Sequence, residues 1–218
     1  MTIREIKREG KSRLSTNHLQ AVLALLVPML IIFAVYGIIF GLIFGLNAFG
    51  LIPVLVLFMF LVTPVVMVGI ARFYYRMTSQ SNVSWDIVLT AFQPAEYPRN
   101  LGRMIQMQIM VQLWMLLLFV PGIIKFFSYA MTPFILADES DNRNLSPITK
   151  SRFMMAGRKG KLFVLVLSFF GWFLLGALTA GILTIVYVGP YFYQTLAVFY
   201  EKEAKPNGKE KLSQFTTS

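Results

Sequence analysis

Few side chains in this sequence are suited to chemistry inside an apolar environment, and Lys125 is the clearest of them. It is the only charged residue in the stretch 104–137. A charged residue within a membrane segment marks a functional site by default. Alternatively, Lys125 lies near an outer turn and extends its long side chain to the membrane surface. We expect this second arrangement.

Gln108 and Gln112 precede Lys125 in the same stretch and share one face of a predicted helix. Their amide groups could hydrogen-bond across neighbouring helices or line a wet cavity. Bonding between helices is the commoner use of such residues in membrane proteins, so we expect it here.

The residues needed for most enzyme sites are absent from the sequence. The chain has no Cys and a single His, His18, which has no neighbours suited to binding a metal. It contains neither a phosphate-binding glycine loop nor a dinucleotide-binding fingerprint. All ten acidic residues fall in polar segments, so the apolar stretches offer no carboxylate for a proton relay. We therefore expect no enzyme activity, no cofactor and no bound metal, and an acid-coupled transporter is disfavoured.

Gly37, Gly41 and Gly45 recur every four residues in the first apolar stretch. Small residues at this spacing let two membrane helices approach closely. The partner is either a second copy of the chain or another helix of the same chain, and we expect the second.

These residues belong to a chain with the composition of a membrane protein. Of its 218 residues, 56% are hydrophobic and only 14% are charged, against roughly a quarter charged in soluble domains. No charged residue occurs between Arg13 and Arg72, a length that suits two spanning helices of roughly 20 residues each. We place these helices near 21–46 and 51–70, joined as a hairpin by a turn at 47–50.

Two further apolar stretches follow, at 104–137 and 162–200. Pro121-Gly122 lies near the middle of the first, and Gly181 and Gly189-Pro190 lie within the second. Such residues end or kink helices. Each stretch is therefore either a hairpin of two short helices or one span plus a broken, partly re-entrant segment, and length alone does not decide between them.

The distribution of basic residues favours hairpins. Nineteen of the 20 Lys and Arg residues lie in the four polar segments that flank the three apolar stretches. Lys and Arg mark the cytoplasmic side of a membrane, and three in-out-in hairpins would put all four segments there. The predicted fold is thus an all-α transmembrane bundle of about six membrane segments, with both termini in the cytoplasm of a plasma-membrane protein.

The predicted divisions of this single domain are a basic N-terminus (1–20), hairpin 1 (21–71), a cytoplasmic loop (72–103), hairpin 2 (104–137), a basic loop (138–161), hairpin 3 (162–200) and a tail (201–218). The N-terminus has no small-residue cleavage site, which predicts an uncleaved anchor. Each hairpin follows a segment that is either an ordinary cytoplasmic linker or a short helix on the inner membrane surface. Such helices would begin at the capping box of Thr2 and Glu5, at Ser84, and at Ser146-Pro147.

The formal net charge of +10 does not indicate nucleic-acid binding, because topology explains where the basic residues lie. The basic stretch 150–161 would also attract anionic lipid headgroups, at about 1 kcal/mol per charge near the surface. The expected partner is the lipid bilayer; a second copy of the chain and another membrane protein are further partners that the sequence leaves open.

An ordered set of residues in the second half of the chain resembles a known family. The set comprises Tyr129, Met131, Phe134, Ile135, Asp138, Ser151, Arg152, Met155, Gly157, Lys159, Phe163, Leu165, Leu167, Ser168, Phe169, Trp172, Pro190, Tyr191, Phe199 and Tyr200. It resembles the uncharacterised bacterial integral membrane proteins grouped as domain of unknown function 975, most clearly over 114–200. The resemblance implies a bacterial host and a membrane location but no catalytic residues. It draws attention to Ser151, Arg152, Gly157, Lys159, Trp172, Pro190 and Tyr191, where a helix start, a tight turn or packing would serve equally well.

These observations favour a non-enzymatic binding, scaffolding or protective component of the bacterial envelope. The alternative is a small permease or permease subunit with its substrate site at a broken helix, near Pro121-Gly122 or Gly189-Pro190. A midplane cavity lined by polar side chains would favour the permease, and a solid, glycine-packed bundle would favour the scaffold.

Overall fold

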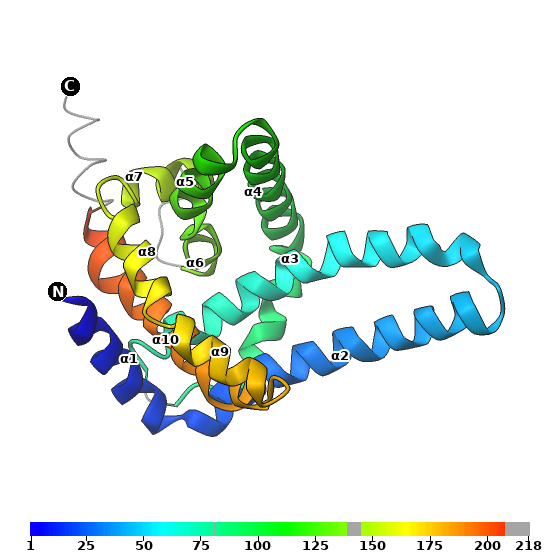
Figure 1. Cartoon of the computed structure of the whole chain (residues 1–218), viewed down its shortest axis with the longest axis horizontal. Coiled ribbons are helices and arrows are strands. Elements are labelled where there is room, and N and C mark those ends of the chain that lie inside the picture. Colours follow the sequence, from blue (N-terminus) through cyan, green and yellow to red (C-terminus); the bar gives the residue numbers. More distant parts are fainter. Residues whose placement is uncertain (81, 139–144, 208–218) are drawn as a thin grey trace.

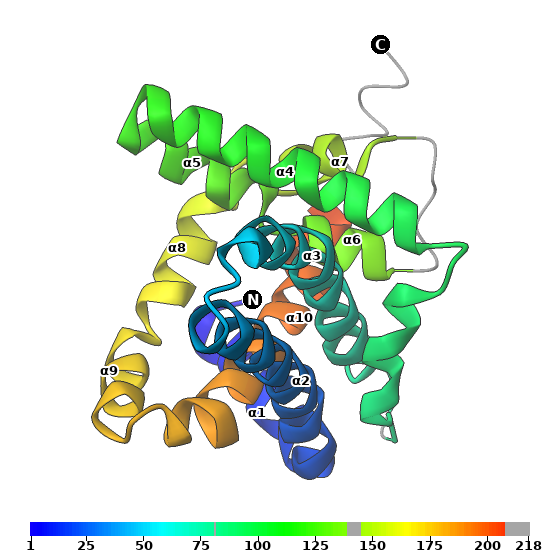
Figure 2. The ribbon, with the colours of Figure 1, turned by 90° about the vertical axis from the view of Figure 1, so that its right-hand side faces the viewer.

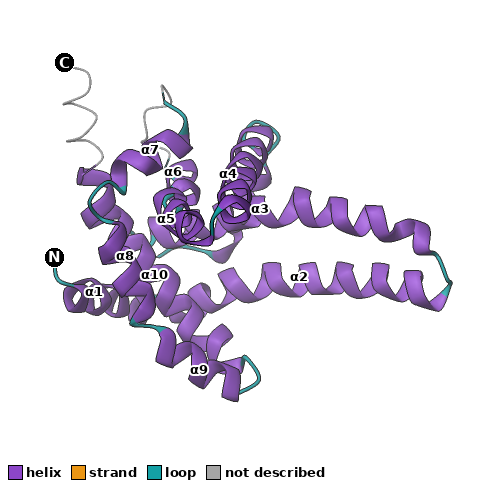
Figure 3. Cartoon of the chain, turned by 45° about the horizontal axis from the view of Figure 1, so that its top comes forward, coloured by secondary structure: helices purple, strands orange, loops and turns teal. Residues whose placement is uncertain are grey.

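The chain folds into helices joined by short turns, in a computed structural model that describes residues 1–80, 82–138 and 145–207 (Figures 1 and 3). No strand occurs among these residues, so the predicted all-α class is confirmed for them. The helices, with short 3₁₀ and π segments marked η, are α1 (Ile3–Thr16), α2 (His18–Gly45), η1 (Phe49–Leu51), α3 (Ile52–Arg76), η2 (Trp85–Phe92), α4 (Tyr97–Leu117), α5 (Phe119–Tyr129), α6 (Thr132–Ala137), α7 (Pro147–Met154), α8 (Lys159–Leu167), α9 (Phe170–Leu178), η3 (Thr184–Val188), α10 (Gly189–Phe199) and η4 (Tyr200–Ala204).

Helices α2 and α3 form the predicted first hairpin, whose outer part, residues 29–61, extends away from the rest of the molecule (Figure 1). We call this part the arm and the remaining described residues the body. The turn at the tip of the arm uses Asn47, with a φ of 52°. Large apolar side chains such as Phe33, Ile38 and Leu57 are exposed along the arm. Exposed apolar surface on this scale is stable where lipid replaces water.

The second apolar stretch folds back on itself, because α4 and α5 pack against each other across a turn at Leu118. The turn thus precedes Pro121-Gly122, where the sequence predicts a break. Pro121 instead lies in the first turn of α5, where a missing backbone N–H costs nothing. A Cβ at Gly122 would lie 2.6 Å from the sulfur of Met115, so this glycine allows α5 to approach α4 closely.

The third stretch also reverses once, at Ala180 and Gly181, which have φ angles of 51° and 86°. Helices α8 and α9 lead into the turn, and η3 and α10 lead out of it. Gly189-Pro190 does not end a helix here, since Pro190 lies in the first turn of α10.

Four helical segments in the described part of the chain are long and apolar enough to cross a membrane, where the sequence predicts about six. They are His18–Gly45, Phe49–Arg76, Phe119–Ala137 and Lys159–Leu178. Helix α4 is not among them and carries Arg99 and Arg103 in addition to three glutamines. Helix α10 is an 11-residue helix between two π-helical turns.

Helix α10 is central to the body and packs against α1, α2 and α3. Around this core lie α4 with α5 and α8 with α9, visible on two sides of the arm when the molecule is viewed along it (Figure 2). The apolar stripe of α1 is buried, with Ile6 at 0% and Leu14 at 2% exposure. Gly10 brings α1 against α10, because a Cβ there would lie 2.8 Å from the Thr195 hydroxyl.

The predicted surface helices have most of their apolar side chains covered by protein, although Leu89 on η2 is exposed. The capping box of Thr2 and Glu5 starts α1 as predicted, but α1 packs on α10. The segment after Ser84 is the 3₁₀ turn η2, which packs on α3. Helix α7 starts at Pro147 as predicted and packs on α5 and α6. An amphipathic helix buries its apolar stripe against whichever apolar surface is available, and here the body supplies it.

Candidate functional site

A buried carboxylate, Glu203, joins three cationic groups at one end of the body. Its oxygens lie 2.8 Å from Nη1 of Arg158, 2.7 Å from Nζ of Lys161 and 2.7 Å from the amino group of Met1. Burial alone would raise the pKa of Glu203, but the hydrogen bonds from Lys161 and Met1 outweigh burial and lower it. Glu203 is therefore an ionised structural anchor at neutral pH.

A second buried carboxylate, Asp138, lies at the same end of the body. Nζ of Lys205 lies 2.7 Å from Oδ2 of Asp138 and donates to the hydroxyl of Tyr75 at 2.7 Å. The hydroxyl of Tyr200 donates to the same carboxylate at 3.0 Å. Burial would lower the pKa of Lys205, but Asp138 and Tyr75 raise it above its ordinary value.

Further polar contacts tie the start of the loop after α3 to this framework. Nη1 of Arg13 donates to the carbonyl of Thr78 at 2.5 Å. Within the body, the buried Arg72 pairs with Glu96 and donates to the hydroxyl of Thr90 at 2.8 Å. These pairs neutralise buried charges, and no group of His, Cys, Asp and Glu among the described residues is arranged to hold a metal ion.

A basic pocket of about 330 Å³ lies between α5, α7 and the start of α8. Lys125, Arg152 and Lys159 line it together with Ser128, Thr149, Phe153 and Ala156. Nζ of Lys125 also lies 4.5 Å from the ring centre of Trp114 on α4. Lys125 thus lies beside residues of the 138–161 loop and not at an outer turn, because α5 packs against α7 and α8.

Ser151 and Gly157 shape the walls of this basic pocket. The buried Ser151 hydroxyl donates to the carbonyl of Ser128 at 2.8 Å and accepts from the backbone N–H of Met131 at 3.3 Å. This links the junction of α5 and α6 to α7. Gly157 has a φ of 77° in the turn between α7 and α8, a conformation that glycine adopts at no steric cost.

Trp172, Pro190 and Tyr191 pack at the other side of the body. Pro190 occupies the first turn of α10 and is buried. The ring centre of Tyr187 lies 5.7 Å from that of Trp172 and 5.9 Å from that of Tyr191. These residues hold α9 against η3 and α10 and do not reach the basic pocket.

Gly37, Gly41 and Gly45 do not pack against another helix of this chain. A Cβ added at any of them would meet nothing within 4 Å among the described residues. Helix α2 meets α3 through larger side chains instead, as where the rings of Tyr36 and Phe58 lie 5.7 Å apart. The intrachain packing expected from the sequence is therefore absent at these glycines.

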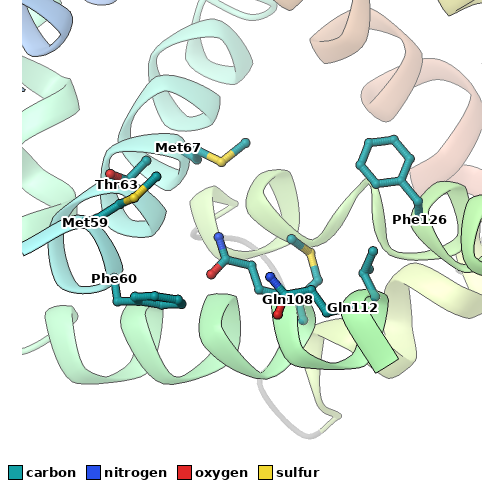
Figure 4. A pocket seen from close by; sticks show the side chains of 9 residues that line it. Met59, Phe60, Thr63, Met67, Gln108, Gln112 and Phe126 are labelled. Atoms are coloured by element: carbon teal, nitrogen blue, oxygen red, sulfur yellow. The ribbon is translucent and has the colours of Figure 1, made fainter. Parts of the chain in front are cut away.

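An open pocket of about 390 Å³ lies between the root of the arm and helices α4 and α5 (Figure 4). We call it the methionine pocket; its lining residues are Met59, Phe60, Thr63, Met67, Met107, Gln108, Val111, Gln112 and Phe126. Gln108 and Gln112 line this pocket and form no hydrogen bond to another described side chain, so the expected bonding between helices is not found. Thr63 and Met67 also line an apolar groove of about 450 Å³ between α2, α3 and α10.

The methionines are the site residues that the sequence reasoning missed. Met59, Thr63 and Met67 are spaced by four on α3, and Met107 and Val111 are spaced by four on α4. That spacing puts each set on one helix face. It could have indicated a shared surface, but not that a cavity separates the two faces.

Residues 102–205 match the model of a family described as "Protein of unknown function (DUF975)". The match confirms the resemblance drawn from the sequence and includes the three cations of the basic pocket. No curated protein and no solved structure matches the chain.

Proposed function

We propose that this chain, whose residues 102–205 match the DUF975 family model, is a non-enzymatic multi-pass protein of the bacterial plasma membrane that binds an apolar or amphipathic molecule. The observation that carries the proposal is the methionine pocket. Its methionines offer an adaptable apolar lining, and Gln108 and Gln112 add the few polar groups that orient a ligand. Its rim includes the exposed Met59 and Phe126, so a ligand enters from the surrounding lipid.

The contacts at the polar end of the body support three in-out-in hairpins with both termini in the cytoplasm. Glu203 in the C-terminal segment contacts Met1 and the loop residues Arg158 and Lys161. Arg13 contacts Thr78 in the loop after α3. The first and third apolar stretches thus begin and end near the same end of the molecule, which the basic residues assign to the cytoplasm.

The placement of the buried carboxylates supports a non-enzymatic role. Asp138 and Glu203 are held by cations at the polar end, and neither lines the methionine pocket. The amides and methionine sulfurs of that pocket are suited to contact and not to proton transfer or nucleophilic attack.

Single cysteines in this Cys-free chain test the topology. A membrane-impermeant maleimide applied to whole cells should label Asn47→Cys at the tip of the arm. It should not label Leu145→Cys, an exposed position ahead of α7, until the cells are opened. Labelling of Leu145→Cys from outside would rule out the three-hairpin arrangement.

Native mass spectrometry in a mild detergent tests the proposed binding. We expect the wild-type protein to retain one selective small molecule and Gln112→Trp, which fills the methionine pocket, to lose it. Leu113→Trp is the matched control, since Leu113 is exposed on α4 outside the pocket. It should retain the molecule.

A protein that carries no selective molecule, or equal retention by both tryptophan variants, would contradict the proposal. Uptake of a polar solute by vesicles containing the wild-type protein, abolished by Gln112→Trp, would instead establish the permease alternative.

A further inference from the structure

We infer that Lys125, Arg152 and Lys159 form a binding site for a phosphate group, carried by a lipid headgroup or by a free phosphorylated molecule. The three cations line one pocket of about 330 Å³. This site goes beyond the function proposed above, because it shares no lining residue with the methionine pocket.

Among the described residues, the ion pairs of the basic side chains leave these three charges without an acidic partner. In the segment 150–161, Arg158 and Lys161 both pair with the buried Glu203. Arg152 and Lys159 form no ion pair with any described residue, and no acidic side chain lines their pocket. Like charges held close together repel each other, and an anion bound between them would remove that repulsion.

The donor groups suit phosphate in particular. A guanidinium offers paired N–H donors that match two phosphate oxygens, and lysine ammonium groups are common phosphate ligands. Thr149 adds a hydroxyl in the same lining. Lys125 is held near the site by its contact with the face of the Trp114 ring, which is a favourable placement for a cation.

The walls of the site are fixed before any ligand binds. Ser151 ties α7 to the junction of α5 and α6 through two hydrogen bonds, and Arg152, the next residue, lines the same pocket as Lys125. The left-handed conformation of Gly157 turns the chain so that Lys159 at the start of α8 lines the same pocket. Four residues of the family-like motif are thereby explained: Arg152 and Lys159 as ligands, and Ser151 and Gly157 as positioning residues.

Native mass spectrometry with added lipid tests the inference and separates the two sources of phosphate. Wild-type protein in a neutral detergent is titrated with dioleoyl phosphatidylglycerol, with dioleoyl phosphatidylcholine, or with inorganic phosphate. We expect one tightly retained phosphatidylglycerol if the source is a lipid, a result that depends on the membrane location proposed above. If the source is soluble, inorganic phosphate should raise the melting temperature in the absence of any lipid.

The variant Lys125→Gln, Arg152→Gln, Lys159→Gln should bind about tenfold more weakly or worse, because it removes three charge-assisted contacts. The matched control Arg4→Gln, Arg8→Gln, Lys11→Gln removes the same charge from exposed positions on α1 and should bind like wild type. Arg152→Gln alone serves if the triple variant does not fold, since Arg152 is exposed.

Equal affinity of the pocket variant and wild type would overturn the inference, as would an equal loss in the α1 control. Absence of binding to both inorganic phosphate and phosphatidylglycerol would also overturn it. None of these outcomes would contradict the proposed function, if the wild-type protein still retains its molecule in the methionine pocket.

Discussion

Glycines in the arm and in the body differ in what surrounds them. In the arm, Gly37, Gly41 and Gly45 face open space, while in the body Gly10 and Gly69 sit where another segment passes at van der Waals distance. The arm, which contains no charged residue, exposes its apolar side chains. The body buries Asp138 and Glu203 and pairs each with cations.

This contrast shows which forces hold each region. The arm satisfies its backbone hydrogen bonds within its two helices, which are long and apolar enough to cross a membrane, and leaves many large apolar side chains exposed. The body depends on close packing and on ion pairs between segments far apart in the chain. Substitutions should therefore be costly in the body and tolerated in the arm, and four substitutions test this difference.

The largest effect is expected from Gly69→Ala. Its new Cβ would overlap the backbone carbonyl of Val88, which cannot move without displacing η2 from α3. Overpacking of this kind costs about 3 kcal/mol. Thermal unfolding in detergent should show a much lower melting temperature. An unchanged melting temperature would contradict the close packing of η2 on α3.

Glu203→Gln should destabilise the protein by about 2 kcal/mol at neutral pH, because it leaves Arg158 and Lys161 without their buried partner. The pKa of Glu203 is lowered by folding from its ordinary value of 4.5. The stabilisation is therefore present above about pH 4.5 and is lost as the pH falls through the lower pKa of the folded state.

The wild-type melting temperature should accordingly fall on acidification below about pH 4.5, and the variant should lose less over the same range. Thermal unfolding scans across that range provide the measurement. Identical pH profiles for the two proteins would show that Glu203 does not anchor the polar end.

Tyr200→Phe should have a smaller effect, of about 1 kcal/mol. It removes the hydrogen bond from the Tyr200 hydroxyl to Asp138 but leaves the ion pair of Asp138 with Lys205. Denaturant unfolding would measure the difference in the free energy of unfolding, if the variant and the wild type have the same m value. A loss as large as that of Gly69→Ala would mean that the two interactions to Asp138 act as a unit.

Gly41→Ala should raise the stability slightly, by about 0.5 kcal/mol, because Ala is favoured over Gly inside a helix and a Cβ at this position of the arm meets nothing within 4 Å. A loss of stability that depends on protein concentration would reveal a second copy packed against this glycine face. That result would break the simple contrast between the arm and the body.

Local signals in the sequence predicted much of the architecture. The absence of charge between Arg13 and Arg72 predicted the arm, and its turn lies at Asn47 as expected. The start of α7 at Pro147 and the capping box of α1 also follow local rules. The bend at Leu118 was misplaced, because proline is tolerated in the first turn of a helix as well as at a break.

Features that depend on contacts between distant segments could not be predicted from the sequence. The basic residues Arg152 and Lys159 belonged to a motif that could be recognised, and Lys125 stood out by its charge. These three side chains line one pocket because α5 packs on α7 and α8. The spacing of residues along the sequence does not predict that packing. The burial of α1 against α10 was missed for the same reason, since an apolar stripe does not identify what covers it.

The packing of the first helix on the last has a consequence for how the protein is made. Helix α1 leaves the ribosome before α10, the helix against which it packs, has been synthesised. The contact is strongly non-local, and such contacts form late because a long loop must close first. The arm can form early, because its two helices are adjacent in the sequence. The body is completed only when α10 is present, so a chain that stops before α10 leaves the apolar stripe of α1 uncovered, and exposed apolar surface of this kind favours aggregation.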